Sequence, residues 1–80
     1  MPRFYFIVHD HWGDAPDDEG AELADIDAAL LQAAEGARSM MSDSIRRGEL
    51  DLEAFIDVED EGRKLVRRLH FGEALNVPAR

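Results

Sequence analysis

Two histidines separated by a single residue, His9 and His11, have the spacing in this chain that most suggests chemistry. In an extended segment alternate side chains point the same way, so two imidazoles at this spacing can share a metal ion. Further ligands would have to come from His70 and from acidic residues of the following segment, which are Asp14, Asp17, Asp18 and Glu19. A strand end is also a common position for exposed polar side chains, and nothing in the sequence brings His70 nearby. We therefore predict no metal site, and we keep a weak histidine–carboxylate metal binder as a third hypothesis.

Residues typical of catalysis are present, but the sequence does not arrange them for it. Cysteine is absent, and three serines on a predicted helix have no histidine within a predictable reach: Ser39, Ser42 and Ser44. The glycines stand alone and form no phosphate-binding loop. The acidic segment 14–20 lacks the alternating oxygen ligands and the distal glutamate of an EF-hand. We predict no catalytic residue, no cofactor and no enzymatic activity.

The size and composition limit what the chain can be. Eighty residues form one domain, residues 1–80. A core of this size supplies about 3–5 kcal/mol, so such domains often depend on disulfides, metals or self-association. Without cysteine, self-association is the most available support, and the composition fits a reducing cytoplasm. The apolar run 4–8 is shorter than a secretory signal core of about 7–15 residues or a membrane span of about 20. We expect a cytoplasmic protein that is not bound to a membrane.

Acidic residues outnumber basic residues by eighteen to nine, which gives a formal net charge of −9. The first forty residues carry nine acidic and only two basic residues. A negative surface repels phosphate backbones, so we expect no nucleic-acid binding. The same charge motivates a second hypothesis, in which the chain is an acidic partner that masks a basic protein, as small antitoxins do. The remaining basic residues come mostly as pairs beside carboxylates, and we interpret them as solvated intrachain pairs.

The first part of the chain predicts a strand, a polar turn and a short return strand. Residues 3–9 alternate as a strand, and residues 10–20 are rich in glycine, proline and aspartate without an apolar period, which is typical of a turn. Trp12 is the one large apolar residue of this turn, and we expect its ring to pack back onto the domain. Residues 22–24 can pair briefly with the first strand.

A long helix follows, with a signal at each end. Asp25 is a suitable N-cap, and Gly48 can adopt the left-handed conformation that ends a helix. One face of the helix collects Ile26, Leu30, Ala33, Ala37, Met40, Met41 and Ser44, flanked by Ala34 and Ile45. Because glycine inside a helix costs about 1 kcal/mol relative to alanine, we expect a close approach of helix to sheet around Gly36 and Ala37.

The remainder of the chain predicts a β-hairpin and a last helical turn. Residues 54–58 alternate as a strand, residues 60–62 form the turn, and residues 65–71 return. Residues 72–75 can form a helical turn, and residues 76–80 are expected to fray.

Unbroken alternation in this hairpin directs five apolar side chains toward the helix: Ile56, Val58, Leu65, Leu69 and Phe71. The same alternation points Arg67 inward. Either a bulge interrupts the return strand, or Arg67 lies at the helix margin with its guanidinium in water.

The first strand is apolar on both sides. Phe4, Phe6 and Val8 lie on one side, while Tyr5 and Ile7 lie on the other. A single helix can cover only one face of a small sheet, so a second copy of the chain is the simplest cover for the other. We predict an interface made of Tyr5, Ile7, Phe55 and Val66, with the acidic turn folding over this face as the alternative.

The sequence also resembles a known family in several segments. These segments are the opening residues 1–6, residues 18–23, residues 25–29, the linker Gly48 to Asp51, residues 56–58 with 60–62, and residues 71–75. They are similar to the domain-of-unknown-function family 6894, short uncharacterised proteins found mainly in alphaproteobacteria. The resemblance implies no activity and no functional residues. Trp12, the histidine pair and Arg67-Arg68 depart from the family's pattern.

The predicted fold is α+β, a small and mainly antiparallel sheet packed on one face by a single long helix. The element order is β-β-α-β-β, with a short second strand. The leading hypothesis is a non-enzymatic homodimeric interaction or regulatory module.

Overall fold

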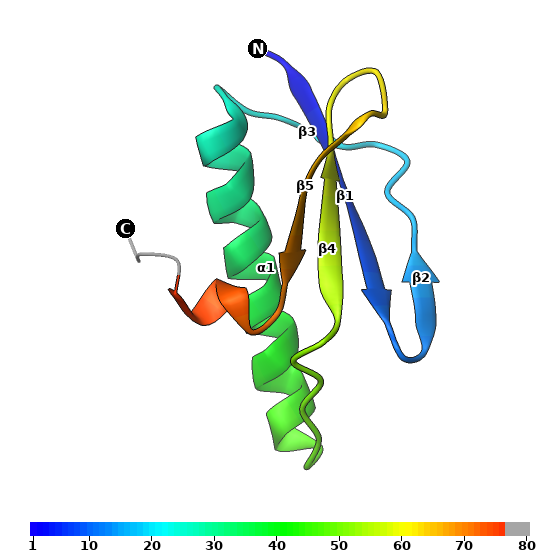
Figure 1. Ribbon diagram of the computed structural model, residues 1–80, viewed down its shortest axis with the longest axis vertical. Helices are drawn as coiled ribbons and strands as arrows, with labels where there is room; N and C mark the ends of the chain where they lie inside the picture. The colour runs from blue at the N-terminus through cyan, green and yellow to red at the C-terminus, as the bar shows by residue number, and fades with distance from the viewer. Residues whose placement is uncertain (77–80) are drawn as a thin grey trace.

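The computed structural model describes residues 1–76 and has one long helix lying along one face of an antiparallel sheet (Figure 1). Its elements are β1 Arg3–Asp10, β2 Gly13–Ala15, β3 Ala21–Glu22, α1 Ile26–Arg46, β4 Phe55–Glu59, β5 Leu65–His70 and the 3-10 helix η1 Glu73–Asn76. The α+β class and the single-helix architecture are confirmed. A short return strand is present as β3, but it shares only Glu22 with the predicted range 22–24. The predicted last helical turn, residues 72–75, is present as η1, which also includes Asn76, a residue that was expected to fray. Residues 77–80 of the segment expected to fray lie outside the described residues.

The strand order is β2-β1-β4-β5, and β3 pairs with the beginning of β1. All pairs are antiparallel, and the β1–β4 register runs from Tyr5 opposite Glu59 to His9 opposite Phe55. The helix α1 connects β3, which pairs with β1, to β4, which pairs with β1 along its other edge. The strand β1 therefore has neighbours on both sides, whereas β5 forms a free edge. The first strand therefore lies inside the sheet.

The core lies between α1 and one face of the sheet. Its buried apolar residues are Phe4, Ala29, Ala33, Ala34, Ala37, Met41, Ala54, Ile56, Val58, Leu69, Phe71 and Ala74. The helix begins as predicted, because the Asp25 carboxylate accepts a hydrogen bond from the Ala28 amide at 2.9 Å. Gly48 has φ +82°, the left-handed conformation expected at the helix end. The buried alanines allow the helix to approach the sheet closely.

Two expectations about the helix are wrong. A Cβ on Gly36 would have no neighbour within 4 Å, so this glycine does not mark a close approach to the sheet, whereas Ala37, which was expected beside it, is fully buried. Ile45 is 60% exposed, because the last turn of α1 faces a groove rather than the sheet. Ala29 is also buried, although the predicted apolar face of the helix did not include it.

A bulge interrupts the β4–β5 hairpin. The register shifts between Val58 and Glu59, so that Val58 lies opposite Arg67 while Glu59 lies opposite Leu65. Leu65 is consequently 49% exposed, and the prediction that it faces the helix is wrong. The bulge lies between Leu65 and Arg67 and does not turn Arg67 away from the helix, so the second alternative, a position at the helix margin, holds for Arg67. It shares the helix-side face with buried Val58, and its guanidinium lies 3.6 Å from the Glu73 carboxylate at the margin.

The polar segment after β1 was predicted to be a turn, but it contains the short strand β2. β2 pairs with the end of β1, from Val8 opposite Ala15 to Asp10 opposite Gly13. The tight connection carries the Trp12 ring beyond the end of the sheet, where it is 77% exposed. The expectation that Trp12 packs back onto the domain is therefore wrong.

The side chains of Asp17 and Arg3 hold the loop between β2 and β3 against the edge of β1, and Arg3 donates to the Glu19 carbonyl at 2.6 Å. The Asp17 carboxylate accepts hydrogen bonds from the amides of Phe6 and Gly20, each at 3.0 Å. Burial opposes ionisation of this group, but the amide hydrogen bonds outweigh it and hold the pKa of Asp17 below its usual value. The loop therefore covers the part of β1 between the segments paired with β2 and β3.

We expect Gly20→Ala to lower the free energy of unfolding by about 2–3 kcal/mol. Gly20 has φ +69°, and a Cβ there would lie 2.7 Å from the Phe4 carbonyl oxygen and 3.0 Å from the Tyr5 ring. Urea unfolding followed by circular dichroism measures the change.

Gly48→Ala is the matched control, since Gly48 also has a positive φ but its Cβ would meet nothing within 4 Å. It should cost only about 1 kcal/mol. Equal losses in the two variants would show that the contact with β1 contributes nothing.

Candidate functional site

The face of the sheet opposite α1 has no helix over it. Alternation along β1 places Tyr5, Ile7 and His9 on this face, and the register with β4 sets Phe55 and Asp57 beside them. Tyr5, Ile7, His9 and Phe55 are all half-buried. The prediction that β1 has a second apolar face outside the reach of the helix is confirmed, and we call this surface the open face.

A buried carboxylate organises the centre of the open face. Asp57 is only 8% exposed. It accepts two hydrogen bonds from Arg68, at 2.7 and 3.1 Å, and its second oxygen lies 3.3 Å from His9 Nε2. The other ring nitrogen of His9 lies 2.6 Å from Asp14. The hydrogen bond to Asp57 raises the pKa of the Arg68 guanidinium above its usual value.

Aromatic rings and guanidinium groups lie over one another beside this carboxylate. Phe55 is stacked on His9 with ring centroids 4.7 Å apart, and it contacts His70 at 5.4 Å. The Arg68 guanidinium lies 4.2 Å from the Phe55 ring centre, and the Arg63 guanidinium lies 3.5 Å from that of Tyr5. These cation–π contacts cover part of the apolar surface with charge.

The charge on the open face differs between its two edges. Asp14 of β2 lies at one edge, with its side chain 66% exposed. Arg63, Arg68 and His70 lie at the β5 side, each with its side chain about half exposed. An apolar centre is thus bordered by Asp14 on one side and, on the other, by basic groups that each contact a carboxylate, from Glu59, Asp57 and Glu73.

The four predicted interface residues are not all brought together by the pairing. Tyr5, Ile7 and Phe55 share the open face. Val66 lies at the bulge, outside the paired register, and is 42% exposed. Sequence alternation cannot locate a bulge, because the extra residue shifts every later side chain by one position.

The two N-terminal histidines have different partners. His9 lies between Asp14 and Asp57, whereas His11 Nδ1 lies 3.2 Å from the Asp51 carboxylate at the end of the sheet. The carboxylates beside His9 approach opposite ring nitrogens, so they cannot converge on one ion together with the ring. Within residues 1–76 no group of three histidine, aspartate or glutamate side chains is placed to hold a metal ion.

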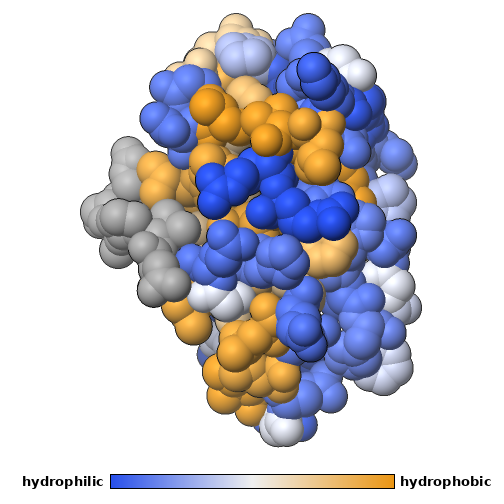
Figure 2. Space-filling view, viewed as in Figure 1, coloured by the Kyte–Doolittle hydropathy of each residue, from blue (hydrophilic) through white to orange (hydrophobic). Residues whose placement is uncertain are grey.

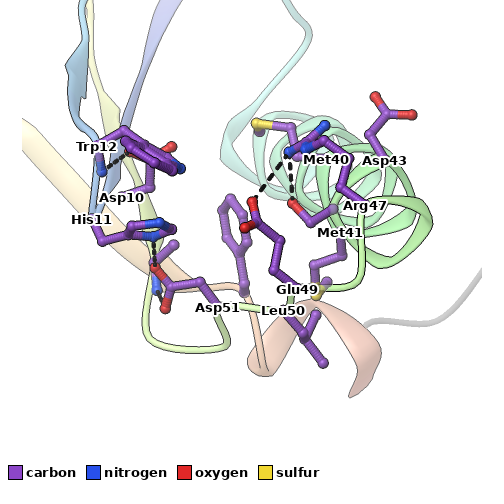
Figure 3. A pocket seen from close by; sticks show the side chains of 13 residues that line it. Asp10, His11, Trp12, Met40, Met41, Asp43, Arg47, Glu49, Leu50 and Asp51 are labelled. Carbon is purple, nitrogen blue, oxygen red and sulfur yellow. Dashed lines mark hydrogen bonds and ion pairs between the residues drawn. The ribbon is translucent and has the colours of Figure 1, made fainter.

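A cleft of about 490 Å³ opens at the end of the molecule where His11 lies (Figure 3). The β1–β2 turn forms one wall, and the last turns of α1 with the following linker form the other. Its lining is Asp10, His11, Trp12, Met40, Met41, Asp43, Ser44, Arg47, Glu49, Leu50, Asp51, Ala54 and Phe71. Met41, Ala54 and Phe71 belong to the core, so the cleft reaches down to buried apolar side chains.

The polar groups of the cleft are held by local contacts. The hydrogen bond from His11 lowers the pKa of Asp51, and the same carboxylate accepts bonds from the Glu53 and Ala54 amides. Arg47 lies 3.7 Å from Glu49. Sequence reasoning missed this site, because its two walls are about thirty to forty residues apart and no local pattern links them.

An apolar groove lies beside the cleft, between the end of α1, the linker that follows it and η1. It is lined by Arg38, Met41, Ser42, Ile45, Arg46, Leu50, Leu52 and Leu75. Figure 2 shows an apolar area at this end of the molecule, over the end of α1 and the linker that follows. Ile45, Leu50, Leu52 and Leu75 are 44–64% exposed.

The fold and its surfaces define a small α+β protein with an open sheet face and a cleft at one end. A family model described as Domain of unknown function (DUF6894) matches residues 3–72, and the chain belongs to this family. The resemblance inferred from the sequence is thereby confirmed at the level of the family. No curated protein and no solved structure shows significant similarity to the chain. No helix formed within residues 1–76 is long and apolar enough to cross a membrane.

Proposed function

We propose that the protein is a cytoplasmic, non-enzymatic binding module that acts as a homodimer through its open face. The single observation that supports this proposal is the distribution of charge around the apolar centre of that face. Tyr5, Ile7 and Phe55 provide the centre, Asp14 lies toward β2, and Arg68 lies toward β5.

A two-fold axis parallel to the strands explains how this face can complement itself. Rotation about such an axis brings two open faces together and reverses the strand order of one copy relative to the other. The β5 side of one copy then faces the β2 side of its partner, so that basic groups meet acidic groups twice. Two sheets packed in this way lie about 10 Å apart, with the aromatic and aliphatic side chains between them.

We expect sedimentation velocity at micromolar concentration to detect a dimer that Ile7→Asp converts to monomer. The half-buried Ile7 side chain lies at the centre of the face, and a carboxylate there would be desolvated without a partner. The dissociation constant should rise about 100-fold or more, and added salt should also weaken the wild-type dimer. Circular dichroism melts establish that the variant remains folded.

Ile45→Asp is the matched control, because it makes the same change in the apolar groove beside the end of α1, away from the open face. It should leave the dimer intact. A wild-type monomer at all concentrations, or a dimer dissociated by Ile45→Asp and not by Ile7→Asp, would contradict the proposal.

The charge of the chain supports a second candidate, an acidic partner that masks a basic protein. Exposed carboxylates follow the β2 edge and the next loop, at Asp14, Asp18, Glu19 and Glu22. Such a row attracts a basic surface by long-range electrostatics. An affinity capture in which the tagged chain retained no basic protein would count against this candidate, while leaving the homodimer untouched.

A further inference from the structure

Trp12 is the only tryptophan of the chain, and it is 77% exposed at the rim of the cleft. Its ring contacts that of His11, with centroids 4.7 Å apart. A large indole held in water at the mouth of a cavity is a costly position for an apolar side chain. The Trp12 ring is part of neither the core nor the open face. The cleft that it borders is therefore a surface separate from both (Figure 3).

The bottom of the cleft suits an apolar group. Met40, Met41, Leu50 and Phe71 line it, and Met41 and Phe71 are almost fully buried. The volume of about 490 Å³ lies within the range of about 300–1,000 Å³ that is usual for small-molecule sites. Methionine side chains adapt to ligands of different shapes.

The rim of the cleft is negative. Four carboxylates line it, from Asp10, Asp43, Glu49 and Asp51, against Arg47 and the imidazole of His11, which contacts Asp51 at 3.2 Å. Arg47 is engaged by Glu49 at 3.7 Å and by Ser44 at 3.4 Å. Asp10 at the end of β1 and Asp51 of the linker, which lies 3.2 Å from His11, are at the end of the cleft near Trp12 (Figure 3), away from Arg47. The face of an indole attracts cations as well, so the carboxylates and the ring favour the same sign of charge.

We propose that the cleft binds an organic cation, with an ammonium or guanidinium head joined to an apolar body. The head lies against Trp12 and between the carboxylates of Asp10 and Asp51. The body covers Met40 and Phe71 and displaces water from them. Anions are repelled by the rim, and neutral alcohols gain only the contact with the bottom of the cleft.

Titration with hexylammonium, followed by the fluorescence of Trp12 and by calorimetry, tests the proposal. For a ligand of this size we expect a dissociation constant in the high micromolar to millimolar range. Hexanol and hexanoate are matched neutral and anionic probes of the same length. Hexanol should bind at least about tenfold more weakly, and hexanoate should not bind. Equal binding of hexylammonium and hexanol, or no binding of hexylammonium, would overturn the proposal.

Two aspartate variants test whether hexylammonium binding depends on the carboxylates of the cleft or only on the net charge of the protein. Asp10→Asn removes one charge from the rim but retains an oxygen that can accept the hydrogen bond from the Trp12 amide. It should weaken hexylammonium binding about fivefold, measured by calorimetry. Asp18→Asn removes one charge from the exposed loop before β3, outside the cleft, and should change binding less than twofold. Equal weakening by both variants would show that binding depends only on the net charge of the protein, and it would overturn the proposed site.

A second probe, the peptide acetyl-Leu-Lys-Leu-amide, tests whether the cation is a basic side chain of a partner protein or a free amine. Tighter binding of the peptide than of hexylammonium identifies a basic side chain of a partner protein as the ligand. Tighter binding of hexylammonium identifies a free amine, and either order supports a cation site. The monomeric variant Ile7→Asp should bind hexylammonium as the wild type does, so this test is independent of the homodimer.

Discussion

Leu69→Ala should lower the free energy of unfolding by about 3 kcal/mol, which is most of the stability expected for a domain of this size. Leu69 is 2% exposed and lies opposite Ile56 on the helix side of β5. Truncation leaves a cavity between the sheet and α1, which the surrounding side chains fill only in part. Urea unfolding followed by circular dichroism measures the loss, at one fixed protomer concentration because a dimer is stabilised by mass action.

Leu65→Ala is the matched control in the same strand. The bulge places Leu65 opposite Glu59, where it is 49% exposed, so its truncation should cost less than about 1 kcal/mol. Unbroken alternation would instead place both leucines in the core. Similar losses in the two variants would contradict the register of the hairpin.

Asp57→Ala should lower the free energy of unfolding by about 2 kcal/mol. The carboxylate is buried and accepts charge-assisted hydrogen bonds from Arg68, with His9 on its other oxygen. Removing it frees the guanidinium from its position over Phe55 and breaks the polar link between β1, β4 and β5. Thermal and urea unfolding by circular dichroism report the change.

Asp14→Ala is the matched control, because it also removes an aspartate that contacts His9 but leaves the buried Asp57 carboxylate in place. Asp14 lies 2.6 Å from the other ring nitrogen, but its side chain is 66% exposed. Exposed pairs of this kind contribute about 0–1 kcal/mol, so the variant should unfold almost as the wild type does. A larger loss for Asp14→Ala than for Asp57→Ala would mean that the buried carboxylate does not organise the open face.

Much of the fold could be predicted because its signals are local. The Asp25 cap and the left-handed Gly48 define the limits of α1 through bonds within a few residues. Alternation in residues 4–8 identifies the first strand and its two apolar sides. The hairpin of β4 and β5 follows from two alternating segments joined by a short turn.

The errors came where distant segments decide the outcome. Gly36 has no neighbour because the contact surface of α1 is set by where the sheet lies, which helical periodicity alone cannot specify. Trp12 is exposed because the β1–β2 connection is too short to bring its ring back. The bulge at Val66 depends on cross-strand pairing, which leaves no mark in the pattern of one strand.

The candidate sites depended still more on the tertiary structure. Tyr5 and Ile7 were identified from alternation alone, but the Asp57–Arg68 pair and the row of His9, Phe55 and His70 exist only once three strands are in register. The cleft joins Trp12 to Asp51 and Phe71, residues whose types predict no shared role.

The sequence by itself determined the α+β class, the limits of the helix, the two-sided first strand and the acidic charge, because each depends on covalent neighbours or on composition. Only the tertiary structure decided which polar groups are buried, where the hairpin shifts its register and which side chains line the cleft. These features depend on distances between residues far apart in the chain, and packing alone sets those distances.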